Sequence, residues 1–201
     1  MIENTLPEFL DILSSEISIF IASIDKTAIN EARDLILDSE KNHGRVHVTG
    51  IGKPGHVSGY ISSLLTSTGT PTYILDGTEA VHGSSGQVVP GDVVIAISNS
   101  GQTQELKATI ETLKTNGAKI IGVSGNSDSW LKNASDTFLF AGVKQEGDSL
   151  NKPPRASILA ETIALQSLSV ALQYAKGLNS EQYLKWHPGG SLGKSIREEG
   201  K

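Results

Sequence analysis

The chain has no cysteine, a single methionine and few aromatic residues, which make up 5% of its 201 positions. Without cysteine it forms no disulfide and offers no thiolate as a nucleophile or metal ligand, which is typical of a protein in a reducing cytoplasm. It also has no cluster of Lys or Arg, and its net charge is -5. These features disfavour a nucleic acid or an anionic membrane as the main partner.

The amino terminus lacks the basic region, apolar core and cleavage site of a signal peptide. The longest apolar stretch near it, residues 17–24, has about a third of the length of a membrane span and ends at Asp25. We therefore expect a cytoplasmic protein with no membrane segment. The length predicts one domain, with a helical segment over residues 1–42 and an α/β core with carboxyl-terminal helices over residues 43–201.

Apolar periodicity predicts a helical start followed by alternating strands and helices. Between Leu6 and Ile36, apolar residues recur at spacings of three and four, which indicates one long amphipathic helix or two short ones. This stripe packs either on the chain's own sheet or on a neighbouring subunit. Strands are predicted at residues 45–50, 72–75, 93–97, 119–123 and 137–140.

The connections between these strands decide the fold class. A turn over residues 51–56 precedes a helix to about residue 68, a polar loop covers 76–91, and a short helix is predicted over about 127–134. A long helix over 155–176 is apolar nearly all round and is expected to be buried. This order predicts an α/β fold with a parallel sheet covered on both faces, and such sheets bind ligands at the carboxyl ends of their strands.

The clearest candidate site follows the predicted strand 93–97, which runs into a turn rich in hydroxyl groups. A helix beginning near residue 102 would direct its free N–H groups and positive dipole end at this turn. A single serine acting as N-cap is the simpler alternative. Neither a P-loop nor a Rossmann glycine motif is present. We predict a phosphate site formed by Ser98, Asn99, Ser100, Gly101 and Thr103.

Four further residues are candidates for chemistry. Lys53 follows the first predicted strand, where a cation would stabilise an oxyanion, although a solvated loop lysine is the alternative. Glu105 lies in the first turn of its helix, where it either complements the helix dipole or acts as a general base. Glu146 lies in a loop, and His187 lies in a segment too rich in glycine to belong to a core.

Several short motifs together resemble a known family. They are G-x-G-K at 50–53, S-T-G-T-P at 67–71, E-A-x-H-G at 79–83, D-V-V-I-A-I-S-N-S-G at 92–101 and H-P-G-G-x-L-G at 187–193. On these motifs the chain resembles the sugar isomerase (SIS) domain, and within it the catalytic domain of arabinose-5-phosphate isomerases. The likeness covers about residues 45–197, and the last two motifs are the specific ones.

The resemblance implies a three-layer, doubly wound, flavodoxin-like fold with a five-stranded parallel sheet. It also implies interconversion of an aldose phosphate and a ketose phosphate through an enediol or enediolate, without a cofactor. Family members are commonly tetramers in which a histidine or loop from one subunit completes another's site, so a homo-oligomer, a tetramer or a dimer, is expected. The family's active-site residues and its loop Glu and His correspond to Lys53, Glu105, Glu146, His187, Glu79 and His82.

Two positions depart from the family pattern. Pro54 stands where the family has serine, which removes a hydroxyl near the phosphate, and Arg155 stands in a stretch where the family is rich in Thr and Ser. Arg155 is a candidate for binding phosphate through two hydrogen bonds. Gly52 and Glu79 complete the predicted substrate-binding residues. The regulatory CBS pair that often follows this domain is not expected.

The sequence therefore predicts an isomerase of the arabinose 5-phosphate and ribulose 5-phosphate type. His187 is expected to assist ring opening as an acid or base, Glu105 or Glu146 to move the proton, and Lys53 to stabilise the oxyanion. The resemblance adds His82 to the catalytic residues. A sensor that binds a sugar phosphate without turnover, or an isomerase of another sugar such as a phosphohexulose, is the alternative. No metal is expected, because His43 and His47 flank a helix-to-strand junction without Cys ligands.

Overall fold

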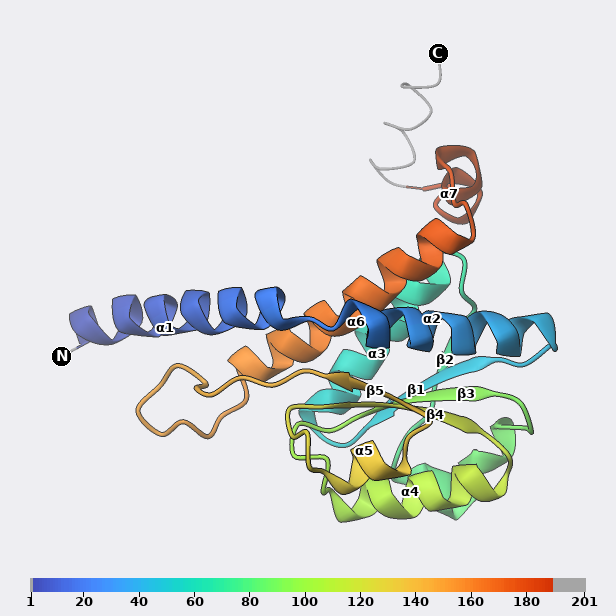
Figure 1. Ribbon diagram of the computed structural model, residues 1–201, viewed down its shortest axis with the longest axis horizontal. Coiled ribbons are helices and arrows are strands. Elements are labelled where there is room, and N and C mark those ends of the chain that lie inside the picture. The colour runs from blue at the N-terminus through green and yellow to red at the C-terminus, as the bar shows by residue number, and fades with distance from the viewer. Residues whose placement is uncertain (1, 190–201) are drawn as a thin grey trace.

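The computed structural model describes residues 2–189, with side chains from Thr5 onward. Two helices form the amino-terminal segment, α1 over Ile2–Ser23 and α2 over Lys26–Lys41. Asp25 separates them, because its carboxylate accepts the amides of Thr27 at 2.8 Å and Ala28 at 3.3 Å and so caps α2. Of the two predicted possibilities, the pair of helices is therefore the observed one, and α1 projects beyond the body of the protein (Figure 1).

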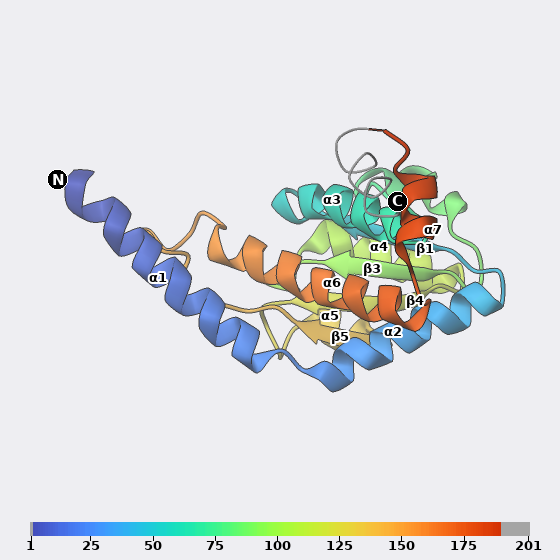
Figure 2. The same ribbon diagram turned by 90° about the horizontal axis from the view of Figure 1, so that it is seen from above.

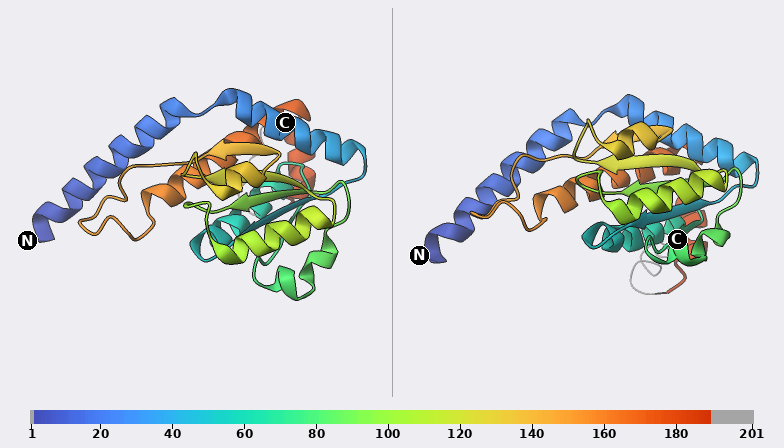
Figure 3. Two further views of the ribbon diagram at one scale, coloured as in Figure 1. Left: turned by 60° about the horizontal axis from the view of Figure 1, so that its bottom comes forward. Right: turned by 90° about the horizontal axis from the view of Figure 1, so that it is seen from below.

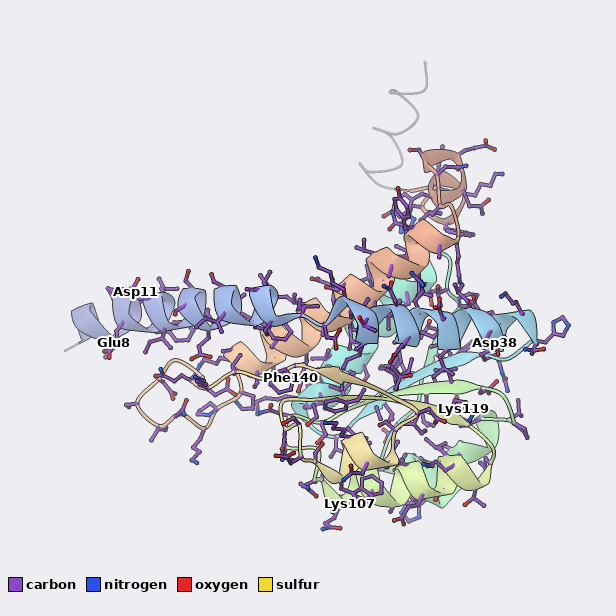
Figure 4. The ribbon with its side chains drawn as sticks, in the orientation of Figure 1. Glu8, Asp11, Asp38, Lys107, Lys119 and Phe140 are labelled. Atoms are coloured by element: carbon purple, nitrogen blue, oxygen red, sulfur yellow. The ribbon has the colours of Figure 1, made fainter. Side chains whose placement is uncertain are left out.

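The sheet has five parallel strands in the order β2-β1-β3-β4-β5. The sequence predicts all five to within one residue at each end, and their bounds are β1 Val46–Gly50, β2 Thr72–Ile74, β3 Val93–Ile97, β4 Lys119–Ser124 and β5 Thr137–Phe140. Figure 4 marks the start of β4 at Lys119 and the end of β5 at Phe140, on opposite sides of the sheet. We call the side on which β1, β3 and β5 end, at residues 50, 97 and 140, the carboxyl edge.

Helices cover both faces of the sheet, which confirms the predicted three-layer, doubly wound fold. One face is covered by α2, α3 and α6, and the other by α4, α5 and two short 3-10 helices, η1 and η2 (Figures 1 and 3). Their bounds are α3 Lys53–Ser67, η1 Glu79–His82, η2 Ser84–Gln87, α4 Gln104–Thr115, α5 Trp130–Ala134, α6 Ala156–Ala175 and α7 Ser180–Trp186. The strand order reverses between β1 and β3, so a ligand is expected beyond the carboxyl ends of these two strands.

The strands alternate between two hydrophobic clusters because successive side chains point to opposite faces. Val93, Ile95 and Ile97 of β3 pack towards α2, α3 and α6, whereas Val94 and Ala96 pack towards α4 and α5. All five β3 residues are buried. The most deeply buried strand therefore leads directly into the predicted phosphate site.

Helix α6 is only half buried, so the prediction of a buried helix is wrong for its outer side. One side packs on the core, but Leu159, Val170 and Tyr174 are 40%, 63% and 89% exposed. By length and composition α6 is also able to cross a membrane, although half of this stretch is buried inside the protein, as in an ordinary core helix. Figure 2 shows α6 lying along α2 and leading up to α7.

Candidate active site

The loop after β3 is closed by its own hydroxyl groups. Ser98 is buried, and its Oγ lies 3.0 Å from Thr103 Oγ1 and accepts the amide of Gly101 at 3.1 Å. Ser100 Oγ accepts the amide of Gln102 at 3.2 Å, and both of these residues are exposed. The loop therefore holds a defined shape and keeps its outer side open to solvent.

The end of β4 supports this loop from the inside. Ser124 Oγ and the amide of Gly125 donate to the carbonyl of Asn99, at 2.9 and 3.0 Å. Gly101 has a φ of 61°, and a Cβ atom at this position would collide with Ser129. Glycine is required here by the positive φ and by the close approach of Ser129, which lies just before α5.

Replacing Gly101 with alanine is expected to lower the free energy of unfolding by about 1–2 kcal/mol, because alanine is strained at positive φ and collides with Ser129. The displaced loop should also weaken phosphate binding. Thermal unfolding and a phosphate titration measure the two effects. The matched control is Gly86→Ala, because a Cβ at Gly86 meets no atom within 4 Å. Equal effects of the two substitutions would contradict the tight fit at Gly101.

Helix α4 directs its amino terminus at the same loop. Thr103 is the N-cap residue, but its side chain makes no cap hydrogen bond and faces Ser98 instead. The first-turn amides of such a helix favour an anion. Glu105 lies in this turn and is exposed. A carboxylate at this position stabilises the helix dipole and is also able to act as a general base, so the structure is compatible with both predicted roles.

Lys53 is the first residue of α3, whereas the sequence predicted a turn up to residue 56. Gly52 has a φ of 68°, and Pro54 occupies the first turn, where its fixed φ suits a helix start. A Cβ on Gly55 would lie 2.9 Å from the carbonyl of Gly50, so the helix begins directly against the end of β1. This explains why the helix starts three residues early.

The Lys53 side chain is exposed, and within residues 2–189 no hydrogen bond or ion pair holds its ammonium group. A cation at a helix amino terminus is unfavourable to the helix dipole. Lys53 therefore has no evident stabilising role in the fold. Beside it is a hollow of about 300 Å³, lined by residues 50–52, 55, 56, 58 and 74–78.

Glu146 is buried in the loop between β5 and α6, where it caps α6. Its Oε2 accepts the amides of Arg155 at 2.6 Å and Ser157 at 3.1 Å, which places its carboxylate at the positive end of the helix. The Arg155 guanidinium donates to Asp148 Oδ2 at 2.6 Å. The predicted contact of Arg155 with phosphate would compete with this ion pair.

Glu161, in the middle of α6, was not predicted as a site residue. It is 0% exposed, and burial, with a smaller contribution from the charge of Glu146, raises its pKa to about 8. The signal in the sequence was available, because Glu161 is the one charged residue among the 20 residues of α6. A charge inside an otherwise uncharged core helix is rare unless it is paired or functional.

The loop residues Glu79 and His82 lie on η1, along the side of α4. Gly77 accepts the hydroxyl of Thr109 in the middle of α4, and the side chain of Asn116, just after α4, donates to Ser85 O at 3.1 Å. Both Glu79 and His82 are exposed. Both residues therefore lie on the solvent-exposed surface of η1, beside α4.

His187 lies near the edge of the sheet where the strands start, opposite to the carboxyl edge. It follows α7 and stacks on Tyr183, with ring centroids 4.0 Å apart. The adjacent Trp186 packs against Gly69, which precedes the start of β2. Since parallel strands start on the edge opposite to the one where they end, His187 is separated by the length of the sheet from the loop after β3, as Figure 1 also shows for α7. The rest of its motif, residues 190–193, lies outside the described residues.

Comparison with known proteins identifies the family of this chain. The SIS domain family matches residues 40–171, which include β1, β3, Lys53, Glu105 and Glu146. The chain belongs to the SIS domain family. Arabinose 5-phosphate isomerase KdsD of Pseudomonas aeruginosa is 40% identical to it over 153 residues, which cover 76% of this chain and 47% of that protein. This SIS domain thus spans about half the length of the curated relatives it matches.

Two solved structures resemble the whole domain. A putative sugar-phosphate isomerase from Listeria monocytogenes has a TM-score of 0.80 and 28% identity, and the alignment covers 94% of this chain and 95% of that one. An Escherichia coli protein solved in complex with arabinose 5-phosphate has a TM-score of 0.77 and 31% identity, with 93% and 95% covered. The SIS domain fold is therefore shared along almost the full described length.

Proposed function

We propose that this SIS domain interconverts a phosphorylated aldose and ketose, most specifically arabinose 5-phosphate and ribulose 5-phosphate. The observation that supports this best is the carboxyl edge itself, where two features follow the strands on either side of the switch point. They are the hydroxyl-lined loop 98–103 and Lys53, which has no ion pair within residues 2–189. The KdsD relative and the structure with arabinose 5-phosphate support the choice of sugar.

In this mechanism the loop 98–103 binds the phosphate and so positions the other end of the sugar. A carboxylate, Glu105 or Glu146, removes the proton next to the carbonyl and returns it to the neighbouring carbon. Lys53 stabilises the negative oxygen of the enediolate between these two steps. The net reaction moves one proton from carbon to carbon and a second proton from the hydroxyl oxygen to the former carbonyl oxygen, so it needs no external oxidant or cofactor. The cysteine-free chain suits a reducing cytoplasm as its compartment.

We further propose that the protein is a homo-oligomer in which His187 completes the site of another subunit. In one chain, His187 lies near the start of β2 and thus too far from the loop 98–103 to take part, and His82 is exposed on η1. The helices α1 and α6 expose apolar side chains that a second copy would cover, namely Leu6, Leu10, Ile19, Ile21, Val170 and Tyr174. A groove of about 740 Å³ between α1, α2 and α6 adds to this apolar surface.

Subunit mixing tests the shared site. Lys53→Ala and His187→Ala subunits are each expected to be inactive or weak, and co-refolding equal amounts should restore about a quarter of the parental activity, because that share of random hybrid sites has both native residues. The control mixes either variant with itself. No recovery in the hybrids would contradict a site formed between subunits.

An isomerisation assay over phosphorylated pentoses and hexoses tests the function, with Glu146→Gln and Lys53→Ala measured beside the parent protein. The expected result is turnover of arabinose 5-phosphate by the parent and strong loss in both variants. Binding of a sugar phosphate without turnover would instead favour a sensor. Turnover of a phosphohexulose alone would identify a different isomerase.

A further inference from the structure

The buried face of α6 carries a second carboxyl group close to Glu146. Neither carboxylate oxygen of Glu161 has a hydrogen-bond partner among the residues that the structure describes. An ionised carboxylate buried without a partner is strongly unfavourable, so the group stays protonated unless a nearby cation compensates it. The apolar core around α6 offers none. A buried group of this kind reduces stability, which makes it a candidate for a functional role.

Helix geometry places Glu161 next to Ser157, whose amide donates to the capping carboxylate of Glu146. Ser157 precedes Glu161 by four positions, so the two share one side of α6. The Ser157 amide donates to Glu146 Oε2 at 3.1 Å, while the buried Ser157 hydroxyl has no partner in the described part of the chain. Burial raises the pKa of Glu161, and the negative charge of Glu146 raises it further. Glu146 is therefore close enough to act on the buried carboxyl group of Glu161.

The other charged groups packed around α6 are already engaged or lie elsewhere. Glu16 of α1 accepts the amide of Lys144 at 2.8 Å. Glu40 of α2 pairs with Lys176 at 2.7 Å, at the opposite end of α6. On α3, Lys53 and His56 are exposed, and its buried face is uncharged, consisting of Val57, Ser58, Ile61, Ser62 and Leu65. Glu146 is thus the charged group that acts on Glu161.

We propose that Glu146 and Glu161 form a carboxyl pair that holds one proton, in which Glu161 is the positioning residue that carries it beside the capping group of Glu146. Two neighbouring carboxyl groups behave in this way because simultaneous ionisation is disfavoured. When Glu161 loses its proton, its charge repels Glu146 and weakens the cap on α6. The proposal rests on the proposed isomerase function, in which Glu146 is one of two candidate bases.

The pH dependence of turnover tests the pair. The parent is expected to lose kcat above about pH 8, where Glu161 ionises, with little change in KM for the sugar phosphate. Glu161→Gln keeps a neutral group of the same shape, so its kcat should persist into this alkaline range. Glu31→Gln, on the exposed side of α2, is the matched control and should follow the parent. The same alkaline loss of kcat in Glu161→Gln would overturn the proposal.

Thermal unfolding tests the pair without relying on activity. The folded chain keeps the Glu161 proton between pH 4.5 and about 8, whereas the unfolded chain releases it near 4.5, so this group makes Tm fall as pH rises through that window. Glu161→Gln should remove this fall and raise Tm at alkaline pH, and Glu146→Gln should shift it to lower pH. Parallel Tm curves for all three proteins would overturn the pair. A parent without turnover on any sugar phosphate would refute the proposed function alone.

Discussion

Replacing Lys53 with alanine is expected to lower kcat/KM for the sugar phosphate by about 10²- to 10³-fold, which is typical for loss of one group that stabilises an oxyanion. The ammonium group is the cation at the start of α3, and nothing within the described residues holds it in a structural contact. The substitution should therefore leave Tm nearly unchanged, because an exposed side chain without partners contributes little to stability. Steady-state kinetics and thermal unfolding separate the two effects.

The matched control is Lys41→Ala, which removes an exposed lysine from the last turn of α2. It should leave kcat/KM unchanged. A loss of the same size in both variants would point to a general effect of positive charge on substrate attraction. A Lys53→Ala protein with parental kcat would contradict the oxyanion role.

Replacing Asp92 with alanine is expected to lower the free energy of unfolding by about 3 kcal/mol, because it leaves buried donors without an acceptor. Asp92 is 0% exposed and lies just before β3. It accepts the amides of Arg45 at 2.8 Å and Val89 at 3.0 Å, and the ring of His47 lies 3.1 Å away. The corresponding fall in Tm for a chain of this length is about 6–12 °C. Asp128→Ala, at an exposed turn position, is the control with little expected effect.

The contribution of Asp92 to the free energy of unfolding should decrease at acidic pH. Burial alone would raise its pKa, but the amides of Val89 and Arg45, with His47, lower it overall from the ordinary value of 3.8. The unfolded chain then takes up this proton before the folded one does as the pH falls. The stability from Asp92 is therefore complete above about pH 3.8 and is lost as the pH falls further through the folded pKa. A constant difference in Tm between parent and variant down to this range would contradict it.

The fold could be predicted almost completely, because its strands are short apolar runs bounded by glycine and polar turns. The residues at which helices begin were harder to predict from turn and capping residues. At Lys53 the helix begins early, since the positive φ of Gly52 and the ring of Pro54 allow it to start directly against the end of β1. The exposure of Val170 and Tyr174 on α6 could not be foreseen, because a helix that is apolar on nearly all sides does not reveal which side packs on the core.

The places of the predicted site residues in the fold could be foreseen only in part. The strand-to-loop order placed Lys53 and the loop 98–103 at the carboxyl edge, because parallel strands end on one side. Glu146 caps α6, and Glu161 has no hydrogen-bond partner among the described residues. Both findings depend on contacts in the folded chain that residue spacing in the sequence does not predict. The distant position of His187 follows from the path of α6 and α7 across the sheet.

A crystal structure of the protein with arabinose 5-phosphate would test the central claim most directly. The account predicts that the phosphate lies on the loop 98–103 at the start of α4, with the sugar carbons extending towards Lys53 and an acidic side chain. An ordered ligand bound away from the carboxyl ends of β1 and β3 would contradict it, as would a sugar whose phosphate end lies outside this loop.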